Sequence, residues 1–310
     1  MRALVARRLD GPDALELIDT ETPAPAAGQV RIKVAAAAVN PVDVAATNGR
    51  LISANLSAPR PQFGLGWDVA GVVDAVGDGV SFVVGTPVIG LSDLLGRPLK
   101  THAEYVVLSA DAVAAAPAGL DLVAASTFAL NALTSLQALE RLGLVAGQSL
   151  LVTGAAGGVG GYAVELGKHL GLTVIAQAGA DDEELVRSFG ASHFVERSAD
   201  LTGAVHDVVP AGVDGVVDAA VLGIGAQEPV RNGGVHAHVV AGEAPIPLRG
   251  IAVHPIFVQA ERAGLESLVK LVEAGALSTR VADTYALSEA ATAYKRLAAG
   301  GVRGRLVLTP

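Results

Sequence analysis

A glycine-rich turn at residues 154–160, GAAGGVG, is the stretch of this sequence whose residue types and spacing best suit ligand binding. Glycine at 157 lets a phosphate approach the backbone, and glycine at 160 lets a helix pack closely on a strand. Free N–H groups at the start of a helix can then face a pyrophosphate. Ala155 replaces the first glycine of the G-x-G-x-x-G pattern. The predicted phosphate contacts are Ala156, Gly157, Gly158 and Val159.

The elements around this turn favour a dinucleotide site. A short apolar run at 150–152 precedes the turn, and a helical pattern follows it. An apolar strand at 173–176, a helical segment at 183–189 and later apolar runs at 215–220 and 235–240 continue the alternation. A glycine turn alone is weak evidence, because such turns also occur where strands simply meet helices. Repeated strand and helix units indicate a parallel sheet that binds a dinucleotide.

The pattern of apolar residues divides the chain into three parts. Residues 1–120 read as short strands broken by prolines and glycines, which predicts a β-rich domain. Residues 121–258 begin with helix-like spacing and then alternate between strands and helices. Residues 259–310 predict two amphipathic helices and a final strand.

Composition restricts the classes of partner. The chain has 310 residues, of which 51% are hydrophobic and 17% charged, enough for sizeable cores. Its net charge of −9, without any block of lysine or arginine, argues against nucleic acid or a membrane as partner and favours a small molecule. Cysteine is absent, which excludes disulfides and thiolate metal sites. No signal peptide is visible, and the alanine-rich tracts are shorter than the roughly 20 residues of a membrane span, so we expect a cytoplasmic protein.

His236 and His238 are the remaining residues with metal-like spacing. Residues two apart on a strand share a face of the sheet. A zinc site needs at least a third protein ligand, and none is visible nearby in the sequence. We therefore expect two strand histidines and no metal site.

Short motifs over nearly the full length occur in an order typical of one family. They are VNPVD at 39–43, GWDVAGVV at 66–73, AEYV at 103–106, the segment 130–139, the glycine turn, GA at 190–191 and GRLVL at 304–308. The chain thus resembles the zinc-independent medium-chain dehydrogenases/reductases, specifically the quinone oxidoreductase (zeta-crystallin-like) family. The resemblance implies an α/β fold with a GroES-like β-rich catalytic domain and a Rossmann domain with a doubly wound parallel sheet.

The resemblance also implies the chemistry. Zinc alcohol dehydrogenases of the wider superfamily have a cysteine where Asn40 stands and a His-Glu pair where Trp67 and Asp68 stand. Those thiolate and imidazole ligands are absent, which implies a zinc-independent enzyme. The implied activity is NAD(P)H-dependent transfer of a hydride to a quinone or an α,β-unsaturated carbonyl.

Asn40 and Thr134 are the candidate catalytic residues and are also expected to contact the cofactor, because the family places both positions near the nicotinamide. Each would donate a hydrogen bond to the carbonyl oxygen as charge develops there, and one such donor is worth about 2.7–4 kcal/mol. As alternatives, Asn40 is a turn residue before Pro41, and Thr134 bonds to its own helix backbone. Asp43 is expected to fix the loop, and water to supply the proton.

Residues near the end of the second Rossmann strand bear on cofactor choice. Gln177 stands where an NAD site would have an acid on the ribose hydroxyls. The acids at 181–184 would repel a 2′-phosphate if they pointed at it, or else begin the next helix. Arg197 would supply positive charge, so NADP(H) is favoured, with NAD(H) as the alternative. The other expected cofactor contacts are Ala178, Ala219, Ala220, Val240, Ala241, Phe257, Val258 and Arg305.

Two alternative functions and one assembly follow from the sequence. The alternatives are a 2-enoyl thioester reductase or specialised tailoring reductase on the same fold, and a cofactor-binding protein with little catalysis. A coenzyme A thioester would require a basic rim around the site, whereas the chain is acidic overall.

The apolar run 251–258 contains Pro255, which suits an edge strand. A bare edge strand promotes aggregation, so we expect a homodimer that pairs this strand with its copy.

Overall fold

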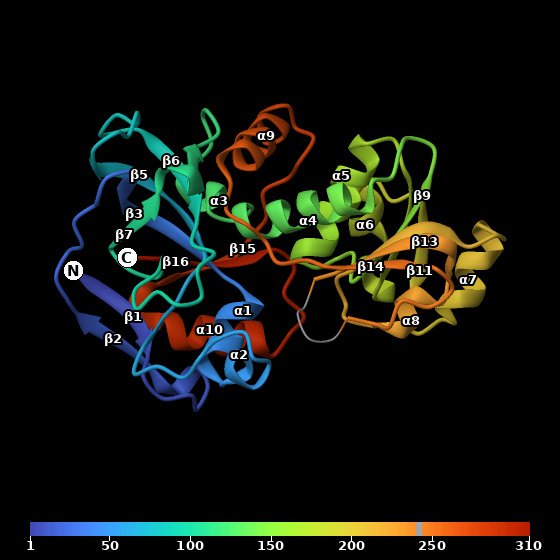
Figure 1. Cartoon of the computed structure of the whole chain (residues 1–310), viewed down its shortest axis with the longest axis horizontal. Helices are drawn as coiled ribbons and strands as arrows, with labels where there is room; N and C mark the ends of the chain where they lie inside the picture. Colours follow the sequence, from blue (N-terminus) through green and yellow to red (C-terminus); the bar gives the residue numbers. More distant parts are fainter. Residues whose placement is uncertain (240–243) are drawn as a thin grey trace. The chain divides into compact units, whose positions relative to one another are not determined.

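In the computed structural model, residues 1–239 and 244–310 are described, and they form two compact units (Figure 1). The first unit consists of residues 1–130 and 259–310, and the second of residues 131–258. Val240 and Ala241, two of the expected cofactor contacts, fall outside the described residues.

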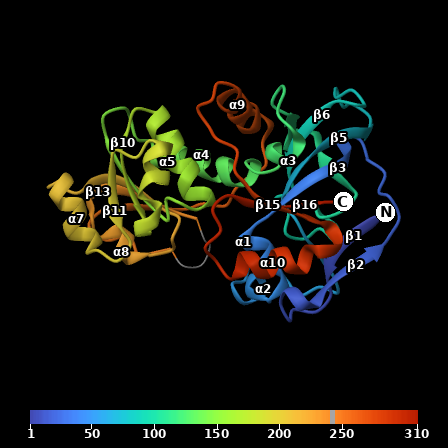
Figure 2. The same cartoon turned by 180° about the vertical axis from the view of Figure 1, so that it is seen from behind.

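The first unit is built on two β-sheets (Figure 2). Its strands are β1 (Arg2–Ala6), β2 (Leu15–Asp19), β3 (Gln29–Val39), β4 (Phe63–Gly64), β5 (Asp68–Val76), β6 (Pro87–Leu91), β7 (Tyr105–Ser109), β8 (Val113–Ala115), β15 (Val281–Ala286) and β16 (Arg305–Thr309). Its helices are α1 (Pro41–Thr47), α2 (Arg50–Ser53), α3 (Leu122–Ala125), α9 (Arg262–Glu273) and α10 (Ala290–Ala298). One sheet has the order β2-β1-β4, and the other the order β15-β16-β3-β5-β6-β8 with β7 paired to β3.

Strand β3 is the centre of the larger sheet. The alternation of Val30, Ile32 and Val34 predicts a strand with one buried face, and all three side chains are buried in β3. They pack with Val73 of β5 and Val106 of β7, the two strands that pair antiparallel with β3. The β-rich domain predicted from the sequence is therefore present.

The end of the chain returns to this sheet. Strand β16 pairs antiparallel with β3, with Leu306 opposite Val39 and Leu308 opposite Ala37. Strand β15 adds to the outer side of β16 in parallel. The last residues thus lie beside the loop that begins at Asn40, directly after β3.

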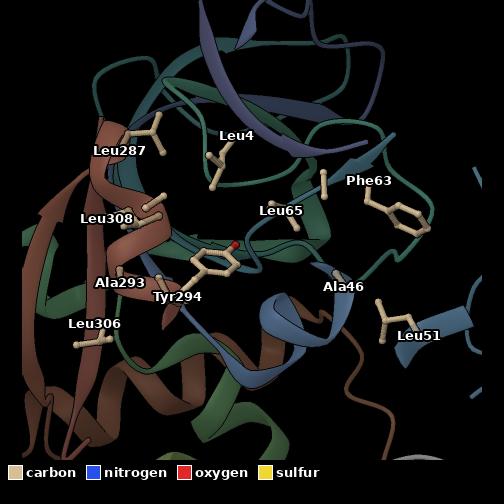
Figure 3. Close-up of a cluster of buried hydrophobic side chains, with 13 residues drawn as sticks. Leu4, Ala46, Leu51, Phe63, Leu65, Leu287, Ala293, Tyr294, Leu306 and Leu308 are labelled. Carbon is tan, nitrogen blue, oxygen red and sulfur yellow. The ribbon is translucent and has the colours of Figure 1, made fainter. Parts of the chain in front are cut away.

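A hydrophobic cluster around Tyr294 of α10 holds this part of the unit together (Figure 3). Tyr294 is fully buried, and its hydroxyl lies 2.9 Å from Nδ1 of buried His102. The other ring nitrogen, Nε2, lies 3.1 Å from the carbonyl oxygen of Ala38 and must carry the hydrogen, since a carbonyl only accepts. Burial lowers the pKa of His102, so the ring is neutral and accepts from Tyr294 at Nδ1.

The second unit contains a six-stranded sheet in which neighbouring strands are parallel. Its strands are β9 (Ser149–Thr153), β10 (Thr173–Ala178), β11 (His193–Glu196), β12 (Val213–Asp218), β13 (Val230–His238) and β14 (Ala252–Pro255). Its helices are α5 (Gly158–His169), α6 (Glu183–Phe189), α7 (Leu201–Val208) and α8 (Ile224–Gln227), and α4 (Ala129–Leu142) begins two residues before the unit boundary. The order β11-β10-β9-β12-β13-β14 is that of dinucleotide-binding folds.

Helices cover both faces of this sheet. A Cβ on Gly167 of α5 would lie 3.0 Å from both Leu150 and Val174, so α5 packs on the face to which these two residues point. Leu151 and Val216 belong instead to a cluster with Val205 of α7 and with α8. The sheet is therefore doubly wound, as the sequence predicts, and both faces are buried.

The helical segment Leu122–Leu142 is unusually apolar. Within residues 1–239 and 244–310 it is the one stretch whose 21 residues and mean hydropathy of 1.4 would suffice for a membrane span. The expectation that no apolar tract is long enough is therefore wrong for length and composition. Since 72% of its most apolar window is buried inside the protein, the segment has the burial of a core helix.

We predict that Tyr294→Phe destabilises the protein by about 1–3 kcal/mol, because it leaves the buried Nδ1 of His102 without a hydrogen-bond donor. Urea unfolding measures this free energy. Tyr105→Phe is the matched control: it removes the hydroxyl of a half-buried tyrosine and should cost less than about 0.5 kcal/mol. Equal losses in the two variants would contradict the role given to the Tyr294 hydroxyl.

Candidate active site

The glycine turn joins β9 to α5 with little room for side chains. A Cβ on Gly160 would lie 2.2 Å from the carbonyl oxygen of Gly154, so only glycine lets helix and strand approach this closely. Gly154 has a φ of 61°, in the region that favours glycine. Gly157 is the N-cap residue of α5, and no side chain caps that helix start. Such an uncapped helix start can receive an anionic group.

The other expected cofactor residues of the second unit lie at the carboxyl ends of its strands. The backbone N–H of Ala155 donates to the carbonyl of Gln177 at 3.0 Å, and that of Arg197 donates to Ala178 at 2.7 Å. The N–H of Ala220 donates to the Thr153 hydroxyl at 3.0 Å. The structure thus brings the glycine turn and residues 177–178, 197 and 219–220 to one edge of the sheet, where doubly wound folds bind ligands.

The structure also gives the positions of other residues that the sequence singled out. The acidic run begins a helix: α6 starts at Glu183, which also pairs with Arg187. Phe257 follows the edge strand β14 and is 59% exposed, with Val258 next to it. Thr134 is buried in α4, in the second unit, whereas Asn40 lies in the first. The catalytic roles of Thr134 and Asn40 stay predictions.

Asn40 begins α1 and is held on every side by protein groups. Its backbone N–H donates to Asp43, which also accepts from the N–H of Gly66, so Asp43 fixes the loop as expected. Its side-chain amide donates to Asp68 at 2.7 Å and to the carbonyl of Ala38 at 3.3 Å. Both amide hydrogens therefore have partners inside the protein, which favours the turn role over direct donation to a substrate.

Arg305 completes this network from the last strand. Its Nη2 donates to the side-chain oxygen of Asn40 and to the carbonyl of Val39. Asp68 accepts in addition from the backbone N–H of Leu130. Burial raises the pKa of Asp68 to about 6, although the hydrogen bonds from Leu130 and Asn40 and the charge of Arg305 oppose the shift. The expected cofactor contact of Arg305 stays a prediction, since its guanidinium reaches Asn40 here.

The residues at this position do not fit a catalytic zinc ion. Asn40 bonds both to Asp68 and to the guanidinium of Arg305, and a metal here would face that positive charge. Trp67 offers no ligand atom, and the ammonium of Lys100 lies 3.7 Å from the centre of its ring. Zinc favours thiolate, imidazole and carboxylate ligands without a competing cation.

Lys100 was not identified from the sequence, because no spacing or motif sets it apart. It is 3% exposed and packs over Trp67, which is also buried. Burial lowers its pKa to about 7; the nearby carboxylates Asp43 and Asp93 oppose this shift, while Arg97 adds to it. The first unit therefore holds two buried groups, Asp68 and Lys100, that titrate close to neutral pH.

The two histidines of β13 have the third neighbour that the sequence analysis did not find. In the parallel pairing of β12 with β13, Asp218 lies opposite His238. Its Oδ2 is 3.5 Å from Nδ1 of His238 and 3.9 Å from Nε2 of His236, and all three side chains are fully buried. The expectation that no third ligand lies nearby is therefore wrong. Asp218 ends the adjacent apolar run, but periodicity does not predict which strand is the neighbour or its register.

Asp218 is charged, while His236 is neutral. Burial raises the pKa of Asp218, but contacts from His238 and Thr153 and from the N–H groups of Leu222 and Gly223 outweigh it and hold the pKa below its usual value. Burial lowers the pKa of His236 to about 4. No ring nitrogen of either histidine has a hydrogen-bond partner within the described residues. An unpaired buried polar group costs about 1–3 kcal/mol, so these rings call for an explanation.

We predict that stability rises between about pH 7 and 10.5, because the folded protein, with the pKa of Lys100 near 7, binds fewer protons there than the unfolded chain. The stability that comes from a neutral Lys100 decreases as the pH falls below 10.5, and it is fully lost once the pH is below 7. Lys100→Met should remove the slope and be roughly 1–3 kcal/mol more stable than the wild type below pH 7, since it no longer buries an ammonium. Urea unfolding across this range tests it; exposed Lys270→Met is the control and should follow the wild type.

Two family models match the chain. Residues 26–118 match the alcohol dehydrogenase GroES-like domain, and residues 189–308 match a model described as zinc-binding dehydrogenase. The second match does not include Asn40, Trp67 or Asp68. Together the two models cover parts of both structural units.

Known proteins are similar over nearly the whole chain. The chloroplast envelope quinone oxidoreductase homolog of Arabidopsis thaliana is 31% identical over 97% of this chain and 95% of its own length. The quinone oxidoreductase of Sus scrofa is 28% identical over 99% of this chain and 97% of its own length. The NADPH-dependent alkenal/one oxidoreductase of Arabidopsis thaliana is 30% identical, over 100% and 80%.

Solved structures agree in fold. The quinone oxidoreductase of Coxiella burnetii has a TM-score of 0.87 at 29% identity and covers 100% of this chain and 99% of its own. An NAD-dependent alcohol dehydrogenase has a TM-score of 0.88 at 30% sequence identity. A mycobacterial protein complexed with NADPH has a TM-score of 0.86 at 25% identity, and both matches cover 100% of each chain. Because a relative covered over nearly its full length is 31% identical and solved structures share the fold, the chain belongs to the quinone oxidoreductase family of the medium-chain dehydrogenases/reductases.

Proposed function

We propose that this oxidoreductase transfers a hydride from NADPH to a quinone or an α,β-unsaturated carbonyl, without a metal ion at Asn40, Trp67 and Asp68. The observation that carries the proposal is the buried network in which Asn40 donates to Asp68 and accepts from Arg305, whose charge also acts on Asp68. These contacts leave no ligand set for a catalytic zinc. Relatives described as quinone and alkenal/one oxidoreductases support the substrate class.

For this hydride transfer the protein needs only to position the two reactants and to stabilise the negative charge that develops on the acceptor. NADPH, when bound, would supply a hydride for the electron-poor carbon of the acceptor. The electron pair then moves to the carbonyl oxygen, and water supplies the proton. A hydrogen-bond donor at that oxygen is worth about 2.7–4 kcal/mol. We assign this donor role to Thr134, because the family resemblance places its position near the nicotinamide.

NADPH is favoured over NADH by the residues at the sheet edge. Gln177 replaces the acid that would bond the ribose hydroxyls of NAD. Arg197 is exposed, beside Ala178, and within residues 1–239 and 244–310 no carboxylate forms an ion pair with it. An exposed guanidinium here suits a 2′-phosphate. Relatives include an NADPH-dependent reductase and a protein solved with NADPH, as well as an NAD-dependent alcohol dehydrogenase.

We predict turnover with NADPH and 1,4-benzoquinone, 9,10-phenanthrenequinone or a simple enone, read as loss of NADPH absorbance. Turnover should persist in the presence of a chelator, because no metal takes part in the hydride step. NADH should be the poorer donor. Binding of NADPH without turnover on any acceptor would favour the cofactor-binding alternative, and turnover restricted to a 2-enoyl thioester would favour the thioester reductase.

Two variants with matched controls separate the assigned roles. Thr134→Val should lower kcat/KM roughly 100-fold or more with little change in NADPH affinity. Thr127→Val makes the same change at a buried hydroxyl bonded to its own helix turn, and should leave turnover intact. Arg197→Ala should weaken NADPH binding roughly tenfold and leave NADH binding unchanged. NADH binding tenfold tighter than NADPH in the wild type would refute the cofactor assignment.

We propose a homodimer through the outer side of β14. This strand pairs with β13 on one side, and the described residues provide no strand for its other side. The segments that flank β14 expose large apolar side chains, with Ile246 73%, Leu248 47% and Phe257 59% exposed. An apolar edge of this kind favours pairing with a copy across a two-fold axis.

The expected result in light scattering at micromolar concentration is a mass twice that of the 31.1 kDa chain. Ile246→Asp should shift the mass toward the monomer by placing a charge in the interface. Val145→Asp introduces the same charge at a residue of the second unit that is 65% exposed and far from this edge in sequence, and should remain dimeric. A monomeric wild type would rule the dimer out.

A further inference from the structure

The carboxyl ends of β12 and β13 bring together a carboxylate and two imidazoles with the composition of a metal site. Asp218 is the last residue of β12. His238 is the last residue of β13, and His236 is two residues before it, on the same face of the strand. One ligand atom of each side chain lies within 4.8 Å of the other two. We infer that Asp218, His236 and His238 bind one divalent transition-metal ion, with Zn²⁺ as the expected ion, in the second unit.

The geometry is close to what such an ion needs. With metal–ligand bonds near 2.0–2.1 Å, ligand atoms of a tetrahedral site are about 3.4 Å apart. Oδ2 of Asp218 is 3.5 Å from Nδ1 of His238 and 3.9 Å from Nε2 of His236. The two imidazole rings are 6.0 Å apart at their centres. Small rotations of three side chains would close the site, with the strands left in place.

The ligand atoms are also chemically available. Both histidine rings are fully buried, and none of their nitrogens has a hydrogen-bond partner among the described residues. A neutral imidazole has a lone pair that can bind a metal. The carboxylate of Asp218 would offset part of the charge of the ion. A metal would therefore bind imidazole nitrogens that have no hydrogen-bond partner among the described residues.

Helix α8 covers the face of the sheet that carries the three ligands. Val216 lies opposite His236 in the strand pairing and packs with Ala226 of α8, so α8 covers the face that carries the cluster. A water molecule would complete four-coordination.

The inferred ion would have a structural role. All three ligands are fully buried, so a substrate carbonyl has no access to the metal. The ion would tie the end of β12 to the end of β13, and it would fix the segment after Asp218 that contains Ala219 and Ala220. The site lies in the second unit and is independent of Asn40, Trp67 and Asp68 in the first. The inference does not depend on the proposed hydride transfer.

Titration of the full-length protein with Co²⁺, after treatment with a chelator, tests the inference. The wild type should bind one Co²⁺ per chain, give the visible absorption of a tetrahedral or five-coordinate site, and lose this absorption when Zn²⁺ displaces the Co²⁺. Zn²⁺ should also raise the Tm of the wild type, because the ion binds the folded state. X-ray absorption on the wild-type Co²⁺ complex should show two imidazoles among the ligands, which requires no variant to fold.

Single variants assign the ligands. His238→Asn, His236→Asn and Asp218→Asn should each weaken Co²⁺ binding roughly tenfold or more. His193→Asn is the matched control, because it removes a half-buried histidine from β11, at the opposite edge of the same sheet, and should bind like the wild type. A folded wild type that binds no Co²⁺, or a Co²⁺ complex without imidazole ligands or unchanged by loss of His238, would overturn the inference.

Discussion

Compensation of a buried carboxylate is the constraint on which the first unit depends. Asp68 is fully buried at the start of β5, and an unpaired charge there would cost about 3–5 kcal/mol. Its partners come from segments far apart in the chain: the amide of Asn40, the backbone N–H of Leu130 and the nearby guanidinium of Arg305. Arg305 begins β16, so the last strand must pair with β3 to bring it there. The loop at Asn40, the start of β5 and the last strand are therefore fixed together.

The same constraint restricts the chemistry. A metal at this position would compete with Arg305 for Asn40 and Asp68, and with Lys100 for the space over Trp67. The first unit thus places two basic side chains against Asn40 and Trp67. Reduction of a quinone or an enone puts negative charge on a carbonyl oxygen, and nearby positive charge favours that charge whether a side chain or a metal supplies it. The loss of metal ligands is for this reason compatible with the proposed reaction.

Local sequence patterns predict many of the strands and helices, but they do not predict which residues distant in the sequence come into contact. The glycine turn predicts β9, the turn and α5, and the absence of room at Gly160 gives the reason. Alternating and continuous apolar runs likewise predict β3 and the strands of the parallel sheet, including β14 at its edge. The ammonium of Lys100 over Trp67 could not be predicted, because residues 33 apart meet only through the packing of the folded sheet. The place of Asp218 beside His238 was missed because a period of two gives the face of a strand but neither its neighbour nor its register.

The segment after Asp218 shows that the second unit obeys a related constraint. Thr153, Leu222 and Gly223 all donate to this carboxylate, and the backbone reaches it through Val221, a β-branched residue with a φ of 59°. Such a conformation costs of order 1–3 kcal/mol and persists only where neighbouring contacts impose it. These donors satisfy Asp218, whereas no ring nitrogen of His236 or His238 has a hydrogen-bond partner among the described residues. A parallel sheet with both faces covered would ordinarily place apolar side chains there. Two imidazoles beside a well-held carboxylate therefore make a stronger case for a bound cation than for apolar packing.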